Sequence, residues 1–203
     1  MTQQVDAEEG RRRAFRNVVG ALKLDRLLPD KVFSGAWSDF LFFQSDQMFA
    51  PEFVEAVGDF LRVENSGVCC LLNLSETGSL EFEKIAAIFL DGAVTGGEYE
   101  TLLRGGGPAV GWLYSMDRYG CASDVGEWCI YCEKNNDIAV VGLRSDSGAS
   151  KFKSSLKKLH AKPVEAIRGG ELAELFPFSK LTSEWRAALT EHYGKGAGSR
   201  TFP

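Results

Sequence analysis

Residues 127–143 read Glu127-Trp-Cys-Ile-Tyr-Cys-Glu133, then Lys134-Asn-Asn-Asp137, then Ile138-Ala-Val-Val-Gly-Leu143. The first and last runs are rich in aromatic and β-branched residues, which are enriched in β-strands. The middle cluster consists of turn-forming residues, and two strand-like runs joined by such a cluster are typical of a hairpin. The stretch therefore predicts an antiparallel pair of strands near 127–133 and 137–143.

Two further strands are expected upstream of this hairpin. Val68-Cys-Cys-Leu-Leu-Asn-Leu74 is a short continuous apolar run between turn-forming residues, which suits a buried, central strand near 68–74. Gly111-Trp-Leu-Tyr-Ser115 is expected to add another strand near 111–115, just before the hairpin. The sheet is therefore predicted to be mainly antiparallel.

Several helices are expected to pack on this sheet, because apolar residues recur at helical spacing between capping and proline signals. Their expected ranges are 6–28, ended by Pro29; 51–65; 80–90, where strand-like alternation at its start is the competing interpretation; 99–104; 152–159; and 183–192, after a Thr182 cap. Residues 32–49 are dense in aromatic side chains and fit neither period. Together these elements predict an α+β fold, a single domain over 1–203 with flexible segments at 1–5 and 194–203.

The composition restricts the class of partner and the compartment. With 203 residues, a net charge of −5 and a pI near 5.2, the chain is not expected to be drawn to the phosphate backbone of nucleic acids. No apolar run reaches the length of a signal peptide's core at the N-terminus or of a membrane span elsewhere. The five cysteines, an odd number, fit reduced thiols rather than a disulfide framework. These features predict a cytoplasmic protein with neither a membrane nor a nucleic acid as its main partner.

One short motif suggests thiol chemistry. Trp128-Cys129-Ile-Tyr-Cys132 matches the Trp-Cys-x-x-Cys of thioredoxin-like oxidoreductases, in which a helix N-terminus acidifies the first thiol. Here a turn and another strand follow Cys132, and two residues three apart on a strand point to opposite faces. Buried strand thiols are therefore preferred over redox catalysis, and Cys129 and Cys132 are the thiols to test.

No metal site and no cofactor are predicted. The remaining cysteines, Cys69, Cys70 and Cys121, do not complete the two close ligand pairs on turns that structural zinc usually takes. His160 and His192 lie far from them in the sequence, on predicted helices. The glycine-rich run that begins at Gly105 lacks the Lys-Ser/Thr of a phosphate-binding loop.

A polar, glycine-punctuated loop is expected over 116–126, between two strands. Long loops on a rigid sheet often carry function, and Tyr and Arg are favoured interface anchors. The predicted partner-binding residues are Trp112, Asp117, Arg118, Tyr119, Asp124 and Trp128. The alternative is an enzyme without a recognisable motif, which would use carboxylates or thiols near 117–133.

The hairpin also carries a family resemblance, through Glu127-Trp128-Cys-Ile-Tyr131-Cys-Glu133 and Asp137-Ile-Ala-Val-Val-Gly142. This pattern is similar to strands of small acidic immunity-type proteins of bacterial polymorphic-toxin systems, and of uncharacterised bacterial proteins around them. The resemblance covers residues 111–144, is structural rather than catalytic, and carries over no functional residue. It implies a non-enzymatic inhibitor that blocks a toxin domain by surface complementarity. A cytoplasmic protein-binding module of this kind, with a basic toxin domain suiting its acidic charge, is the expected function.

Overall fold

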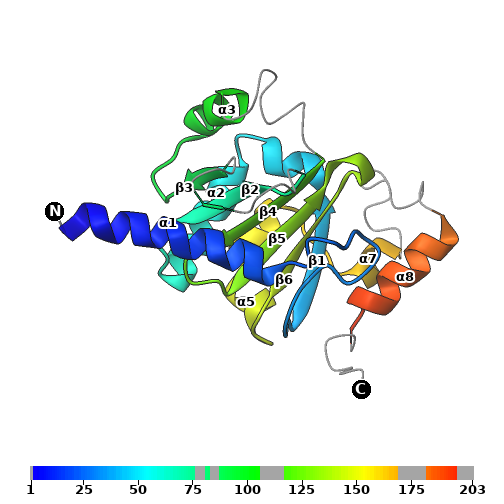
Figure 1. Cartoon of the computed structure of the whole chain (residues 1–203). Coiled ribbons are helices and arrows are strands. Elements are labelled where there is room, and N and C mark those ends of the chain that lie inside the picture. Colours follow the sequence, from blue (N-terminus) through cyan, green and yellow to red (C-terminus); the bar gives the residue numbers. More distant parts are fainter. Residues whose placement is uncertain (1, 76–80, 83–86, 106–116, 169–181, 196–203) are drawn as a thin grey trace.

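The computed structural model describes residues 2–75, 81–82, 87–105, 117–168 and 182–195. Its centre is a six-stranded antiparallel sheet with the strand order β1-β6-β5-β4-β2-β3 (Figure 1). The strands are β1 (Asp39–Gln44), β2 (Cys69–Asn73), β3 (Ala87–Leu90), β4 (Arg118–Ser123), β5 (Trp128–Glu133) and β6 (Ile138–Leu143). The predicted α+β fold with a mainly antiparallel sheet is confirmed.

The hairpin predicted at 127–143 is confirmed as well. β5 pairs with β6 along its whole length, beginning with Trp128 opposite Leu143. The 3-10 helix η2 (Lys134–Asn136) makes the turn between them. Asp137 completes the turn at a φ of 53°, a left-handed conformation that Asp adopts more readily than most residues.

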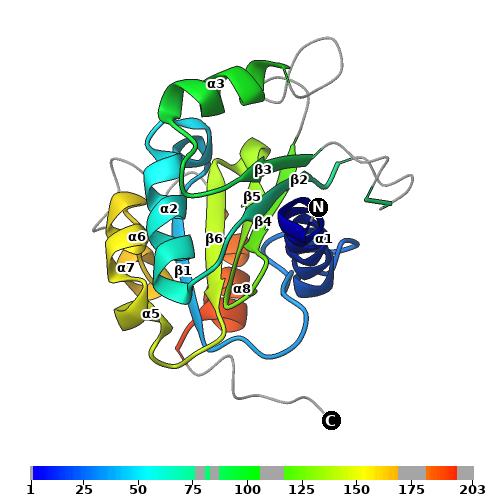
Figure 2. The same ribbon diagram turned by 90° about the vertical axis from the view of Figure 1, so that its left-hand side faces the viewer.

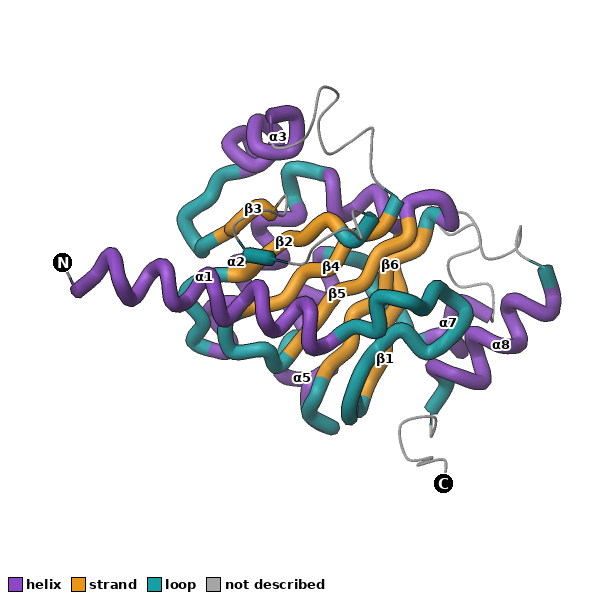
Figure 3. Tube along the Cα trace, viewed as in Figure 1, coloured by secondary structure: helices purple, strands orange, loops and turns teal. Residues whose placement is uncertain are grey.

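Helices cover both faces of the sheet, so the molecule has three layers (Figures 2 and 3). One face packs against η1, α2, α3, α5 and α6, and the other against α1, α7, α8 and the connection 22–38. The bounds are α1 (Thr2–Ala21), η1 (Ser45–Phe49), α2 (Phe53–Glu64), α3 (Gly96–Gly105), α5 (Gly148–Lys151), α6 (Lys153–Lys158), α7 (Val164–Arg168) and α8 (Ser183–Tyr193). Because both faces are covered, β2, β5 and β6 are buried at every residue and carry continuous apolar runs.

The polar loop predicted before the hairpin is wrong over most of its length. Arg118–Ser123 forms β4, which lies between β5 and β2 and is buried from Tyr119 onward. Gly120 lies beneath α1, where a Cβ atom would stand 2.6 Å from Val18 Cγ1 and 2.9 Å from Leu22 Cδ1. This glycine therefore marks a close approach between helix and sheet rather than a loop.

Three other predictions need correction. The helix favoured over 80–90 is wrong at its end, where Ala87–Leu90 forms β3, whereas the strand-like alternation at 80–83 lies largely outside the described residues. The helix expected over 6–28 ends at Ala21, because the chain turns there to pair Leu22 with Phe33 in an isolated bridge. The strand predicted at 68–74 is present as β2, but it lies second from the edge instead of centrally.

The helices expected over 51–65, 99–104, 152–159 and 183–192 are present as α2, α3, α6 and α8, whereas α5 and α7 were not predicted. The aromatic-dense segment resolves into β1 followed by η1. The Thr182 cap of α8 is confirmed, since its side chain accepts a hydrogen bond from Trp185 N at 3.2 Å. α1 begins at Thr2, so residues 2–5 extend this helix. The strand predicted at 111–115 and the tail from residue 196 onward lie outside the described residues.

Candidate functional site

Two of the predicted interface anchors belong to the core. Tyr119 and Trp128 are both completely buried. The Trp128 ring stacks on Phe60 with centroids 4.7 Å apart, and its Nε1 donates to Glu64 Oε1 at 2.9 Å. A partner cannot reach either side chain in this fold, and Trp112 lies outside the described residues.

Asp124 lies at one end of β4 and ties the sheet to α1. Its carboxylate accepts hydrogen bonds from Arg13 Nη2 at 2.9 Å, from Gly67 N at 3.3 Å and from the Ser66 hydroxyl. Burial opposes ionisation of Asp124, but the bonds from Ser66 and Arg13 outweigh it and lower the pKa. Asp124 is therefore an ionised structural anchor between three segments.

Asp117 and Arg118 lie at the opposite end of β4, beside a cleft of about 580 Å³ that also includes Glu133. Arg118 donates to the carbonyl oxygens of Leu24 and Leu74, each at 3.0 Å. The guanidinium is thus occupied in fixing the backbone of two neighbouring segments. The sequence-predicted residues are split between two ends of a strand, and the structure does not bring them together on one surface.

Glu133 is the buried carboxylate of that cleft. It accepts hydrogen bonds from Leu28 N at 2.6 Å and from the Tyr131 hydroxyl at 2.8 Å, and the Asn136 amide also donates to it. Burial raises the pKa of Tyr131, which therefore stays a neutral donor near neutral pH. The bond from Leu28 N holds the 22–38 connection on the sheet, which gives Glu133 a structural role.

The two motif thiols face different layers of the core. Cys129 belongs to the cluster beneath α1, and Cys132 to the cluster beneath α2. Both are completely buried, and this burial raises the pKa of each thiol. A reactive thiolate near neutral pH is therefore disfavoured at both positions.

All five cysteines, which are free and buried, are expected to resist a disulfide thiol reagent at about pH 8 while the protein is folded. All should react once the protein is unfolded in denaturant. A variant with an exposed thiol on α5, Ser150→Cys, supplies the positive control, with one fast-reacting group. Rapid modification of Cys129 or Cys132 in the folded protein would restore the thiol-enzyme alternative.

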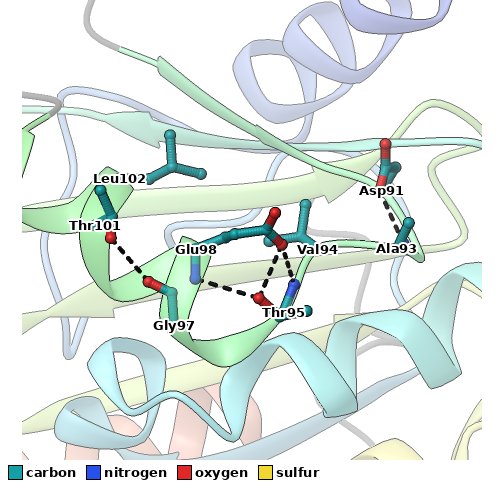
Figure 4. A pocket seen from close by; sticks show the side chains of 8 residues that line it. All are labelled: Asp91, Ala93, Val94, Thr95, Gly97, Glu98, Thr101 and Leu102. Atoms are coloured by element: carbon teal, nitrogen blue, oxygen red, sulfur yellow. Dashed lines mark hydrogen bonds between the residues drawn. The ribbon is translucent and has the colours of Figure 1, made fainter.

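A different concave surface lies where β3 leads into α3, and Figure 4 shows its side chains. We name this surface the α3 basin, and its volume is about 760 Å³. Its lining residues are Asp91, Ala93, Val94, Thr95, Gly97, Glu98, Thr101 and Leu102. Leu102 is 39% exposed and Val94 is half-buried, so the basin combines accessible apolar surface with two carboxylates.

Backbone hydrogen bonds hold both carboxylates of the basin in place. Glu98 Oε2 accepts from Thr95 N and from Thr95 Oγ1, each at 2.8 Å, and Glu98 N donates back to Thr95 Oγ1 at 3.3 Å (Figure 4). This reciprocal arrangement is a capping box, which fixes the first turn of α3. Asp91 Oδ1 accepts from Ala93 N at 2.9 Å. The basin therefore presents two positioned acidic groups.

Both carboxylates of the basin belong to exposed residues and are accessible to a ligand. The hydrogen bonds from Thr95 lower the pKa of Glu98, which keeps this carboxylate ionised near neutral pH. No cationic side chain among the described residues forms an ion pair with Asp91 or Glu98. The arrangement suits a ligand that offers a cation next to an apolar group.

Sequence reasoning missed the α3 basin, although a local signal was available. The spacing Thr95-x-x-Glu98 is the signature of a capping box at a helix N-terminus. It locates the start of α3 and fixes the Glu98 side chain. The exposure of Leu102 carries no comparable signal, since it depends on which elements pack around α3.

Comparison with protein-family models, curated proteins and solved structures finds no match to this chain. Over the described ranges, no group of three or more His, Cys, Asp and Glu side chains is placed to hold a metal ion. No helix in this part of the chain has the length and apolar character needed to cross a membrane.

Proposed function

We propose that this chain is a protein-binding module that receives a basic and apolar segment of its partner in the α3 basin. One observation carries the proposal: Leu102 and Val94 offer accessible apolar surface beside Asp91 and Glu98, which have no ion-pair partner in the described structure. Contact area of this kind becomes favourable when a partner covers it and supplies the missing cations.

The resemblance to immunity-type proteins indicates which class of partner this module would bind. The hairpin resemblance implies an inhibitor of a toxin domain in the bacterial cytoplasm, and a basic toxin domain suits both the net charge of −5 and the acidic rim of the basin. For the enzyme alternative, which would use carboxylates or thiols near 117–133, Glu133 is occupied in holding the Leu28 backbone, and Cys129 and Cys132 are completely buried.

The test is affinity purification of the tagged protein from its native cells, with matched variants. The double variant Glu98→Gln, Leu102→Ala is expected to retain roughly tenfold less partner than the wild type, because truncating a central contact costs more than about 1 kcal/mol. Val63→Ala combined with Glu184→Gln is the control, since Val63 is also 39% exposed and Glu184 is an exposed carboxylate on α8.

The control variant should retain the partner at the wild-type level, by quantitative mass spectrometry. Failure of the wild-type protein to retain any protein in stoichiometric amount would refute the proposal. Equal loss in both double variants would show that the α3 basin is not the binding surface.

A further inference from the structure

The two edge strands of the sheet, β1 and β3, differ in whether their outward backbone groups are hydrogen-bonded. At the β1 edge, Phe42 N donates to Lys162 O at 2.7 Å and Lys162 N donates to Phe42 O at 2.9 Å, so the residue before Pro163 and α7 occupies the outward backbone groups in the middle of this strand. β3 pairs with β2 alone, and no hydrogen bond from the described part of the chain reaches its outer side. Figure 2 looks onto this edge, with β3 in front.

The outer side of β3 offers backbone groups to another strand. In an antiparallel ladder, alternate residues direct their N–H and C=O groups toward the same neighbour. Two of the four residues of β3 therefore direct both groups away from β2. Such a row of backbone groups is a template for strand addition by an extended peptide.

A second concave surface flanks β3 on the side of α1. We name it the α1 groove, and its volume is about 380 Å³. Its lining residues are Asp6, Ala7, Gly10, Arg11, Arg13, Gly67, Val68, Phe89, Asp91 and Asp124. Half-buried Val68 and Phe89 provide apolar surface, and the Arg11 guanidinium lies 5.6 Å from the centroid of the Phe89 ring.

The α1 groove includes Phe89 of β3, and the α3 basin begins at Asp91, the residue that follows this strand, so the two surfaces meet at the end of β3. Successive side chains of a β-strand point to opposite faces. A strand added to β3 would therefore place alternate side chains toward α1 and toward α3. The α1 groove offers apolar contacts from Val68 and Phe89 on one face, and the α3 basin receives the part of the segment that passes Asp91.

The charge of these surfaces indicates the chemistry of the added segment. Together they are lined by four carboxylates, those of Asp6, Asp91, Glu98 and Asp124, and by two guanidinium groups, those of Arg11 and Arg13. The surplus is negative, so an incoming segment with lysine or arginine side chains is favoured over an acidic one.

We propose that the partner docks by adding an extended segment, with basic and apolar side chains, as a further strand along β3. The inference rests on the proposed function and deepens it, since it specifies both the docking strand and the chemistry of the segment. Backbone hydrogen bonds to β3 provide the register, and the flanking surfaces select the side chains.

Amide hydrogen exchange of the full chain tests this docking mode. The probe is a short synthetic peptide of alternating lysine and valine with blocked ends, and a peptide of alternating glutamate and valine is the control. The basic peptide is expected to slow exchange at the outward-facing amides of β3 by at least about tenfold, because hydrogen-bonded amides are protected. Exchange in β1 should not change, and the acidic peptide should protect neither edge.

Charge-neutralising variants test the side-chain part of the inference. Asp91→Asn and Glu98→Gln keep the oxygen atoms that cap the backbone but remove both charges. Together they are expected to weaken binding of the basic peptide roughly threefold to tenfold, whereas Glu184→Gln with Glu191→Gln on α8 should leave it unchanged.

Unchanged exchange at β3 in the presence of saturating basic peptide would overturn the inference, as would equal protection by the acidic peptide. This failure differs from failure of the proposed function. In one outcome, the variant Glu98→Gln, Leu102→Ala loses the captured partner while β3 in the wild-type complex exchanges as fast as in the free protein. In that case the module binds through the α3 basin, and strand addition is wrong.

Discussion

Replacing Glu64 by glutamine is expected to stabilise the folded protein by up to about 3 kcal/mol at about pH 8 and by little at about pH 5. Glu64 ends α2 and is 8% exposed beneath the turn between β4 and β5. Burial raises the pKa of its carboxyl group from 4.5 to about 7, although hydrogen bonds from Ser123 and from Trp128 favour the ionised form. The neighbouring Glu127 carboxylate adds to the rise.

The sign of the effect follows from this raised pKa. Below 4.5 the carboxyl group is protonated in both the folded and the unfolded protein, so its contribution to stability is fully present. As the pH rises toward 7, the unfolded chain ionises while the folded protein holds its proton, and stability is lost. Above 7 the folded protein carries a buried charge, which the neutral glutamine avoids.

The measurement is urea unfolding of both proteins across this pH range. The free energy of unfolding of the wild type should fall with rising pH relative to that of Glu64→Gln. Glu191→Gln, a change at an exposed carboxyl group on α8, is the control and should follow the wild type. Parallel curves for the wild type and Glu64→Gln would show that Glu64 does not hold a proton in the folded state.

Gly120→Ala is expected to destabilise the protein by about 1–3 kcal/mol, the usual effect of overpacking a core. The new methyl group would stand 2.6 Å from Val18 Cγ1 and 2.9 Å from Leu22 Cδ1, distances that force α1 or β4 to move. Val18 is completely buried, and close packing of the core limits how far its side chain can give way. The same measurement of urea unfolding gives the size of the effect.

A double-mutant cycle identifies the contact behind this effect. Combining Gly120→Ala with Val18→Ala should cost less than the sum of the two single changes, since the second removes the atom that the first meets. Gly58→Ala in α2 is the matched control, because no atom lies within 4 Å of its added Cβ, and it should stabilise by roughly 0.5–1 kcal/mol. If the effects of the two single changes on the free energy of unfolding simply add, the contact with Val18 is not the source of the strain.

The hairpin could be predicted from sequence because its residue types agree with its structure. Residues 128–133 and 138–143 combine strand-favouring residues with burial on both faces, so local preference and packing lead to the same result. β4 was missed because Gly120 and Ala122 have weak strand preferences, and the pairing with β2 and β5 overrides them.

The candidate site could not be predicted for a different reason. Their residue types predict interface anchors at Tyr119 and Trp128, but both side chains lie in the core on the face of the sheet that α2 covers. The same residue types serve both purposes, and only the position of the covering helices decides between them. Asp91 and Leu102 meet in one basin because β3 lies at the edge of the sheet, and strand order is not encoded locally.

The bridge between Phe42 and Lys162 also limits self-assembly. A sheet with two open edges can join copies of itself into filaments, because each added chain presents a new edge. Here the chain's own backbone occupies the middle of β1 at Phe42, so two copies that met through β3 would leave no edge along which a third copy could pair without interruption. A partner bound along β3 would likewise form a one-to-one complex, because the bridge at β1 obstructs pairing of a second partner at the opposite edge.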